Sequence, residues 1–149
     1  MVRSLTGKHP GYYEAVLQLR DVSQDVIDFV EKEIVKNSLS IVKFKKVKNG
    51  YDYFLSDNNL TKALGKKLQH HFGGELNITA SLHTKKKDKE LYRLTVLFRE
   101  IKFKKLDKVL YQGDEYVVKG INREILLQNS KNGKKVRVKY KDMKRIKKE

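Results

Sequence analysis

Three segments in the first hundred residues alternate hydrophobic and polar side chains with a period of two. They are residues 13–20, 75–84 and 92–98. Successive side chains of a β-strand point to opposite faces, so this alternation predicts strands that bury one face. In residues 75–84 the side chains that alternate with the hydrophobic positions are mostly small and polar.

A fourth segment, residues 39–48, also alternates, but its pattern slips between Phe44 and Val47. We expect a β-bulge there, because a bulge inserts one extra residue into a strand. Asn49–Gly50 follows directly, and both residue types tolerate positive φ, which predicts a tight hairpin. Residues 51–55 would then form the returning strand.

Two other segments repeat hydrophobic residues at helical spacing. The first runs to Lys36, with Ser23 as a candidate N-cap. The second begins after Asp57 or Asn58, either of which can cap it, and it ends at Gly73–Gly74. The expected buried positions are Val26, Val30 and Ile34 in the first helix, and Leu60, Leu64, Leu68 and Phe72 in the second.

The predicted order of elements is β-α-β-β-α-β-β, with a change of pattern at Phe103. Two helices over one face of a mainly antiparallel sheet form an α/β sandwich of the α+β class, ferredoxin-like or related to it. The short strands that follow predict a small SH3-like β-barrel. We therefore expect a sandwich domain over residues 1–102 and a barrel domain over 103–149. The strand candidates of the barrel are residues 109–111, 115–119, 125–128 and 135–140.

The chain is strongly basic, with 34 Lys and Arg against 18 Asp and Glu and a formal net charge of +16 in 149 residues. Such an excess destabilises a compact state by self-repulsion, which a polyanion relieves. When Lys and Arg side chains bind a phosphate backbone, they release its counterions, and this favours binding whatever the base sequence. The charge therefore predicts a nucleic-acid-binding protein. It is concentrated in residues 101–149, which hold 16 Lys and Arg against 6 Asp and Glu.

Three clusters of basic residues are the candidate RNA contacts. The first lies in segment 39–48, the second at a hairpin tip after segment 75–84, and the third in the last barrel strand and beyond it. Each also has a plainer interpretation: a solvated edge strand, a charged tip that aids solubility, or a basic chain end. The candidate residues are Lys43, Lys45, Lys46 and Lys48; Lys85, Lys86, Lys87 and Lys89; and Lys134, Lys135, Arg137, Lys139, Lys141, Lys144 and Arg145.

The sequence offers no catalytic or metal-binding motif. It has no Cys, and the adjacent His70 and His71 would point in different directions on a helix. We expect a protein that is not an enzyme and has no cofactor, no metal and no small-molecule substrate. An RNA-processing enzyme is the alternative, and it would need close carboxylates or a poised His in a cleft. Eight tyrosines offer rings for base stacking, but no glycine–aromatic signature surrounds them, and we expect most of them in the core or its rim.

No hydrophobic run approaches the ~18 residues that span a bilayer, and the first ten residues contain no signal-like stretch. We therefore expect a cytoplasmic protein with no membrane partner.

Three longer stretches resemble a known protein family. They are HPGYYEAVLQLR (residues 9–20), VKFKKVKNGYDYFLSD (residues 42–57) and HFGGELNITASLHTKKKDKELYRLTVLFR (residues 71–99). Together they are similar to the large-ribosomal-subunit export adaptor family of the Nmd-three type, in its archaeal form. The resemblance implies an α/β domain followed by an SH3-like barrel, in agreement with the division at residue 102.

The resemblance also implies a function. Members of this family bind the large ribosomal subunit on its subunit-interface face and act in late ribosome assembly or quality control. The partners would be ribosomal RNA and large-subunit proteins, and we expect a monomer away from the ribosome. The family usually begins with zinc-binding CxxC pairs, so we expect a form without the N-terminal zinc-binding domain, whether truncated or naturally absent. A translation-factor-like module that visits the tRNA exit region is a further alternative.

Overall fold

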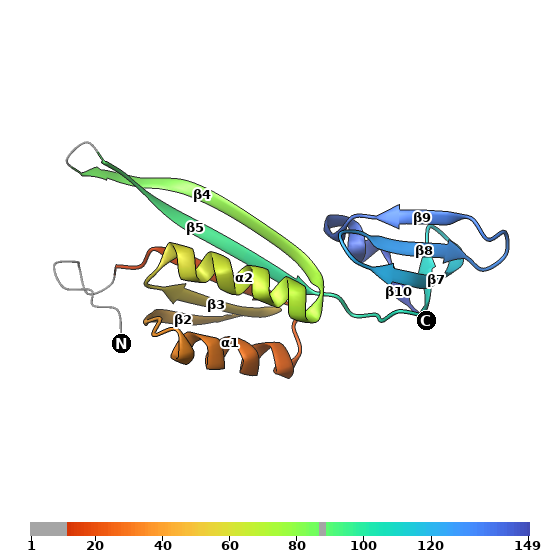
Figure 1. Cartoon of the computed structure of the whole chain (residues 1–149), viewed down its shortest axis with the longest axis horizontal. Helices are drawn as coiled ribbons and strands as arrows, with labels where there is room; N and C mark the ends of the chain where they lie inside the picture. Colours follow the sequence, from red (N-terminus) through yellow and green to blue (C-terminus); the bar gives the residue numbers. More distant parts are fainter. Residues whose placement is uncertain (1–11, 87–88) are drawn as a thin grey trace. The chain divides into compact units, whose positions relative to one another are not determined.

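The computed structural model describes residues 12–86 and 89–149. The chain divides into two compact units (Figure 1). The first contains the described residues up to Phe72 together with Leu76–Glu100, and the second contains Gly73–Glu75 and Ile101–Glu149.

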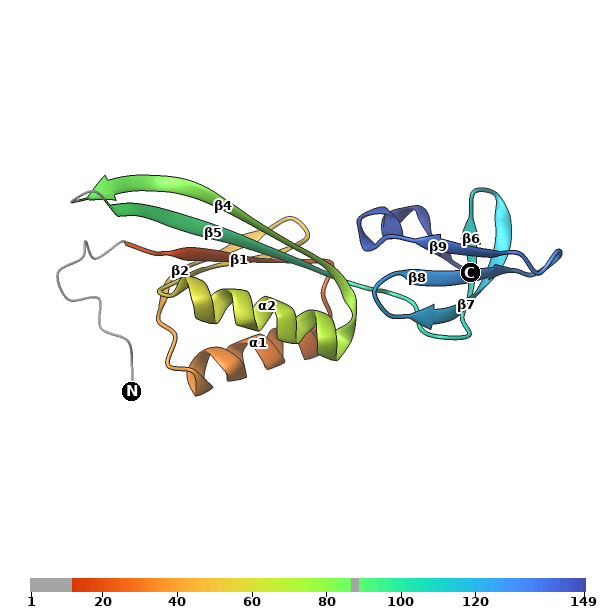
Figure 2. The ribbon, with the colours of Figure 1, turned by 45° about the horizontal axis from the view of Figure 1, so that its top comes forward.

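The first unit consists of a five-stranded sheet and two helices. The strands follow each other across the sheet in the order β2-β3-β1-β5-β4. Both helices lie on the same side of this sheet (Figure 2). The elements are β1 (Ala15–Arg20), α1 (Gln24–Lys36), β2 (Ile41–Val47), β3 (Gly50–Leu55), α2 (Asn58–Phe72), β4 (Gly74–Lys86) and β5 (Lys89–Glu100). The α+β class is confirmed, and this arrangement is compatible with the predicted sandwich.

The sheet contains one parallel pairing, which is compatible with the mainly antiparallel sheet expected from the sequence. β1 pairs with β3 in antiparallel orientation, but it pairs with β5 in parallel orientation, from Ala15 opposite Leu94 to Arg20 opposite Arg99. The reason is topological. α2 leads into β4 at the edge of the sheet, and β5 turns back from β4 and therefore reaches β1 running in the same direction as β1.

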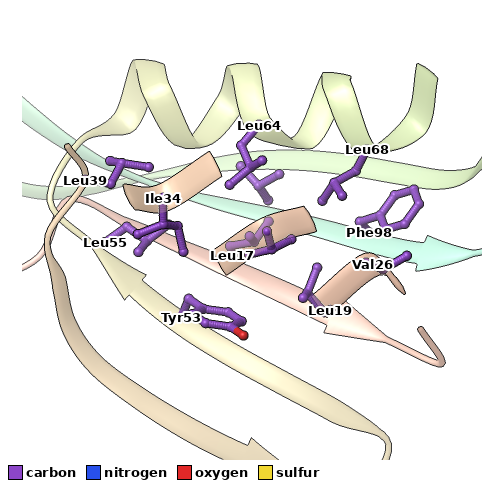
Figure 3. Packing of buried hydrophobic residues seen from close by; sticks show 12 residues of the cluster. Leu17, Leu19, Val26, Ile34, Leu39, Tyr53, Leu55, Leu64, Leu68 and Phe98 are labelled. Atoms are coloured by element: carbon purple, nitrogen blue, oxygen red, sulfur yellow. The ribbon is translucent and has the colours of Figure 1, made fainter. Parts of the chain in front are cut away.

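The core of the first unit lies between the sheet and the helices (Figure 3). Most of the predicted hydrophobic positions of α1 and α2 are buried there, but Leu60 and Phe72 are only partly buried. Thr61 and Gly65 are buried on α2 instead, because the helix lies very close to β5: a Cβ added at Gly65 would lie 2.5 Å from Cγ1 of Val96. The fully buried side chains include Leu17, Leu19, Val26, Val30, Tyr53, Leu55, Leu68, Val96 and Phe98.

The predicted helix ends are confirmed. Ser23 is the N-cap residue of α1, although its side chain makes no capping hydrogen bond. At α2 the backbone N–H of Leu60 donates to Oδ1 of Asp57 over 2.9 Å, so the cap is Asp57. Gly73 follows the last residue of α2 with φ of +82°, in the left-handed region that glycine adopts without strain.

The bulge predicted between Phe44 and Val47 is wrong. Both residues pair in regular register with β3, and the register of β2 shifts between Ile41 and Lys43 instead. β2 is an edge strand whose residues are all exposed or half-buried, so burial does not impose strict alternation on its sequence. The predicted β2–β3 hairpin is confirmed, with Val47 opposite Gly50.

The second unit is a five-stranded sheet with the order β10-β6-β7-β8-β9, in which each strand is antiparallel to its neighbours. The strand expected to reach Tyr140 ends at Val138, and Tyr140 begins a short 3₁₀ helix that continues to Arg145. Its own hydrophobic core includes Val109, Val118, Ile125 and Leu127. The strands are β6 (Lys108–Tyr111), β7 (Asp114–Ile121), β8 (Ile125–Asn129), β9 (Lys135–Val138) and β10 (Lys147–Lys148). This unit is compatible with the small barrel that the sequence predicts.

Candidate nucleic-acid interface

The lysine cluster of β2 is divided between the two faces of the sheet. Residues opposite each other on neighbouring antiparallel strands share a face. Lys45 lies opposite Asp52, whereas Lys46 lies opposite Tyr51, which packs against the core beneath the helices. Lys43 and Lys45 therefore lie on the face away from the helices, which we call the open face. Lys46 lies on the helix side, and Lys48 follows the end of β2.

Aromatic rings and cations form a row on the open face. The guanidinium carbon of Arg93 lies 3.9 Å from the ring centre of Tyr13 and 5.8 Å from that of Tyr12. The rings of Tyr13 and Phe54 meet edge to face, with centres 4.8 Å apart and planes at 80°. The ammonium group of Lys43 lies 5.3 Å from the ring centre of Phe54. The residues of this row come from β5, the segment before β1, β3 and β2.

Two arginines of the same unit are held in ion pairs within the chain. Arg20 pairs with Asp52 at 2.8 Å, and its guanidinium also donates to the backbone oxygens of Leu19 and Tyr51. Arg99 pairs with Asp21 at 2.5 Å. Arg20 and Arg99 are therefore neutralised by these carboxylates, whereas Lys43, Lys45 and Arg93 add positive charge to the open face.

The basic cluster of the second unit is exposed throughout. Lys135 and Arg137 share one face of β9, because Val136 and Val138 alternate with them and Val138 is buried. The preceding turn is well ordered. Oδ1 of Asn129 accepts hydrogen bonds from the backbone N–H groups of residues 131 and 132, and Oδ1 of Asn132 accepts one from that of Lys134. The turn therefore presents Lys134 from a defined backbone.

A shallow hollow in the second unit brings a predicted residue together with one that the sequence analysis missed. It is lined by Asn122, Arg123, Glu124, Leu126 and Arg137. Arg137 is one of the candidate RNA contacts, and it lies opposite Leu126 in register. Arg123 lies in the turn between β7 and β8 and belongs to none of the basic clusters, so no cluster in the sequence indicated it. Arg93 was missed for the same reason. Guanidinium groups suit phosphates because they donate in a planar fork.

The second predicted cluster falls on the hairpin between β4 and β5. Lys85 and Lys86 end β4, and Lys89 begins β5. Lys87 lies outside the described residues. The involvement of these lysines in RNA binding stays a prediction.

The described residues do not form a metal site. In the described ranges 12–86 and 89–149, no three His, Cys, Asp or Glu side chains form a group that would hold a metal ion. The exposed side chain of His71 on α2 stacks on Phe29 of α1, with ring centres 5.0 Å apart. No helix in this part of the chain is long and hydrophobic enough to cross a membrane.

A comparison with protein families finds a match over most of the first unit. The sequence profile of the second domain of NMD3 matches residues 12–99. This range begins at Tyr12, just before β1, and ends one residue before the end of β5. A search among curated proteins gave no match. Because the family match covers more than half of the sequence, this chain belongs to the NMD3 family of ribosome-associated adaptor proteins.

Proposed function

We propose that the protein binds the large ribosomal subunit through ribosomal RNA and acts in late ribosome assembly or quality control without catalysing a reaction. The family match over residues 12–99 is the observation that carries this proposal. The exposed cations of both units support it, since phosphate contacts supply most of the affinity of RNA-binding proteins that lack base-specific contacts. The proposed contacts are Lys43 and Lys45 of β2, the lysines of the β4–β5 hairpin and the basic cluster of the second unit.

The family suggests where on the ribosome this binding takes place. We place the protein on the subunit-interface face of the large subunit, in the cytoplasm, with large-subunit proteins as additional partners. A protein on that face would collide with the small subunit. It should therefore sediment with free large subunits and be depleted from joined ribosomes. A translation-factor-like module would instead sediment with joined ribosomes, so the same experiment separates the two functions.

Gradient sedimentation with purified ribosomal subunits at near-physiological salt tests the proposal. The test variant replaces Lys134, Lys135, Arg137 and Lys139 by Glu. These side chains are exposed, so the fold should survive. We expect the wild type to migrate with large subunits and the variant to lose most of this binding. Equal binding of the wild type to small and large subunits would leave only a non-specific polyanion binder.

A control with the same net charge separates a local patch from overall charge. It replaces four exposed lysines of the helices, Lys32, Lys36, Lys62 and Lys66, by Glu. We expect this variant to keep its preference for large subunits and most of its affinity. If both variants lose binding equally, net charge rather than the basic cluster of the second unit determines the affinity.

A further inference from the structure

We propose that the open face of the first unit binds single-stranded RNA, with Tyr13 and Phe54 stacking on bases and with Lys43, Lys45 and Arg93 contacting the adjoining phosphates. This inference rests on the proposed function in taking RNA as the ligand, and it goes further by naming a surface and the form of RNA that the surface accepts.

The register of the sheet places these side chains together. Phe54 lies opposite Val16 on β1 and opposite Lys43 on β2. Its chain neighbours Tyr53 and Leu55 are buried in the core. Phe54 therefore points away from the helices, and within the described residues no helix covers this face (Figure 2). The ring of Phe54 is half-buried in the chain, so part of it is accessible to a ligand.

The geometry of the row suits a stacked base with a phosphate beside it. Tyr13 and Phe54 meet at 80°, so neither ring covers the flat face of the other completely. The cations of Arg93 and Lys43 lie over the rings of Tyr13 and Phe54, 3.9 Å and 5.3 Å from the ring centres, so one cation adjoins each ring. Single-strand binding proteins combine these two elements, since aromatic rings stack on bases while a positively charged groove follows the backbone.

The rest of the face favours RNA over a hydrophobic partner. Leu76 and Ile78 of β4 pack against the core, so Asn77, Thr79 and Ser81 alternate onto the open face, where they are exposed. Their amide and hydroxyl groups can hydrogen-bond to bases or to 2′-hydroxyls. A duplex would hide its base faces from Tyr13 and Phe54, so the surface fits a single strand.

The test measures the affinity of the full chain for a fluorescein-labelled single-stranded RNA of ~10 nucleotides by fluorescence anisotropy. The variant Tyr13→Leu/Phe54→Leu removes both rings and changes no charge. We expect its affinity to fall roughly 5- to 150-fold for each base that no longer stacks. For an abasic backbone of the same length and charge, the variant and the wild type should bind equally.

Phe44→Leu is the matched control. Phe44 is adjacent to Lys43 on β2 and is 50% exposed, but it lies opposite Tyr53 and therefore on the helix side of the sheet. We expect this variant to bind RNA like the wild type. An equal loss in both variants, no loss in the double variant, or the same loss on the abasic strand would overturn the proposal.

A second measurement covers the case in which the double variant does not fold. Wild-type protein is photocrosslinked to the same RNA carrying 5-bromouridine, and the crosslinked peptides are mapped. Crosslinks at Tyr12, Tyr13 or Phe54 support the proposal, and crosslinks confined to other segments contradict it. The outcome is independent of the sedimentation experiment. Stacking on the open face with no preference for large subunits would remove the proposed function alone, and large-subunit binding without stacking would remove this inference alone.

Discussion

Position 50 is occupied by glycine, and the sheet has no space there for a larger side chain. A Cβ added to Gly50 would lie 1.8 Å from the carbonyl oxygen of Leu19 on β1, a backbone atom that cannot move without disturbing the β1–β3 pairing. The sequence indicated a glycine that permits positive φ in a turn. The structure shows instead that Gly50 starts β3, with a φ outside the left-handed region, and that the requirement for glycine is steric.

We therefore expect Gly50→Ala to lower the free energy of unfolding of the first unit by about 2–4 kcal/mol. Gly120→Ala is the control, because Gly120 also lies in a strand, β7, but the nearest atoms to its added Cβ are 3.9 Å away. Its cost should stay within about 1 kcal/mol. Urea unfolding followed by circular dichroism measures both. Equal destabilisation by the two substitutions would show that loss of glycine, and not the contact with Leu19, is responsible.

Glu33 shows a second residue whose role depends on a distant partner. It is buried on α1, and the ammonium group of Lys67 on α2 donates to its Oε1 over 2.7 Å. This hydrogen bond holds the pKa of the Glu33 carboxyl below its usual value, against the effect of burial, which raises it. The helical pattern did not include Glu33 among the expected buried positions of α1, because Glu33 and Lys67 meet only when α1 and α2 pack side by side.

Among the elements, those whose sequence is constrained by burial were predictable. β1 alternates strictly between buried and half-buried residues, and most of the hydrophobic stripes of α1 and α2 are buried as expected. The parallel pairing of β1 with β5 was not predictable, because it depends on which strands meet after folding and leaves no period in the sequence. β2 lies between these cases. Its existence was predicted, but the position of its bulge and the division of its lysines between two faces were not, since an edge strand buries too few residues to fix them.

The division of the β2 lysines gives a prediction at the scale of this strand. If the open face binds RNA, Lys43 and Lys45 contact phosphates and Lys46 does not. Replacing Lys43 and Lys45 by Gln should make the slope of log affinity against log salt shallower by about 1.4, because each phosphate contact on a single strand contributes about 0.7. The control replaces Lys46 and Lys66, an exposed residue of α2, by Gln. It removes the same charge and should leave the slope almost unchanged.

Fluorescence anisotropy with single-stranded RNA at several salt concentrations measures these slopes. The same change of slope in both variants would mean that the RNA responds to the total charge of the first unit and does not distinguish its faces.

For the whole molecule, the question is how the two units share its stability. Each has its own hydrophobic core, around Leu17 and Leu19 in the first and around Ile125 and Leu127 in the second. The second unit is small, and small domains bury a lower fraction of their surface, so we expect it to be the less stable of the two. A protein that places cations from two folded units on one RNA gains affinity from both only while both are folded. Loss of the second unit should therefore weaken RNA binding without unfolding the first.

Two matched substitutions test whether the units fold independently. Leu17→Ala and Leu127→Ala each truncate a side chain with 0% exposure, and such truncations cost about 2–5 kcal/mol. Hydrogen exchange followed by mass spectrometry reports the protection of each segment in the full chain. We expect Leu17→Ala to lower protection in β1, β3, β5 and the helices alone, and Leu127→Ala to lower it in β6–β9 alone, because each cavity lies within one core and leaves the packing of the other intact. If either substitution reduces protection equally in both units, the chain unfolds as one cooperative body, and the division into two units describes its architecture but not its folding.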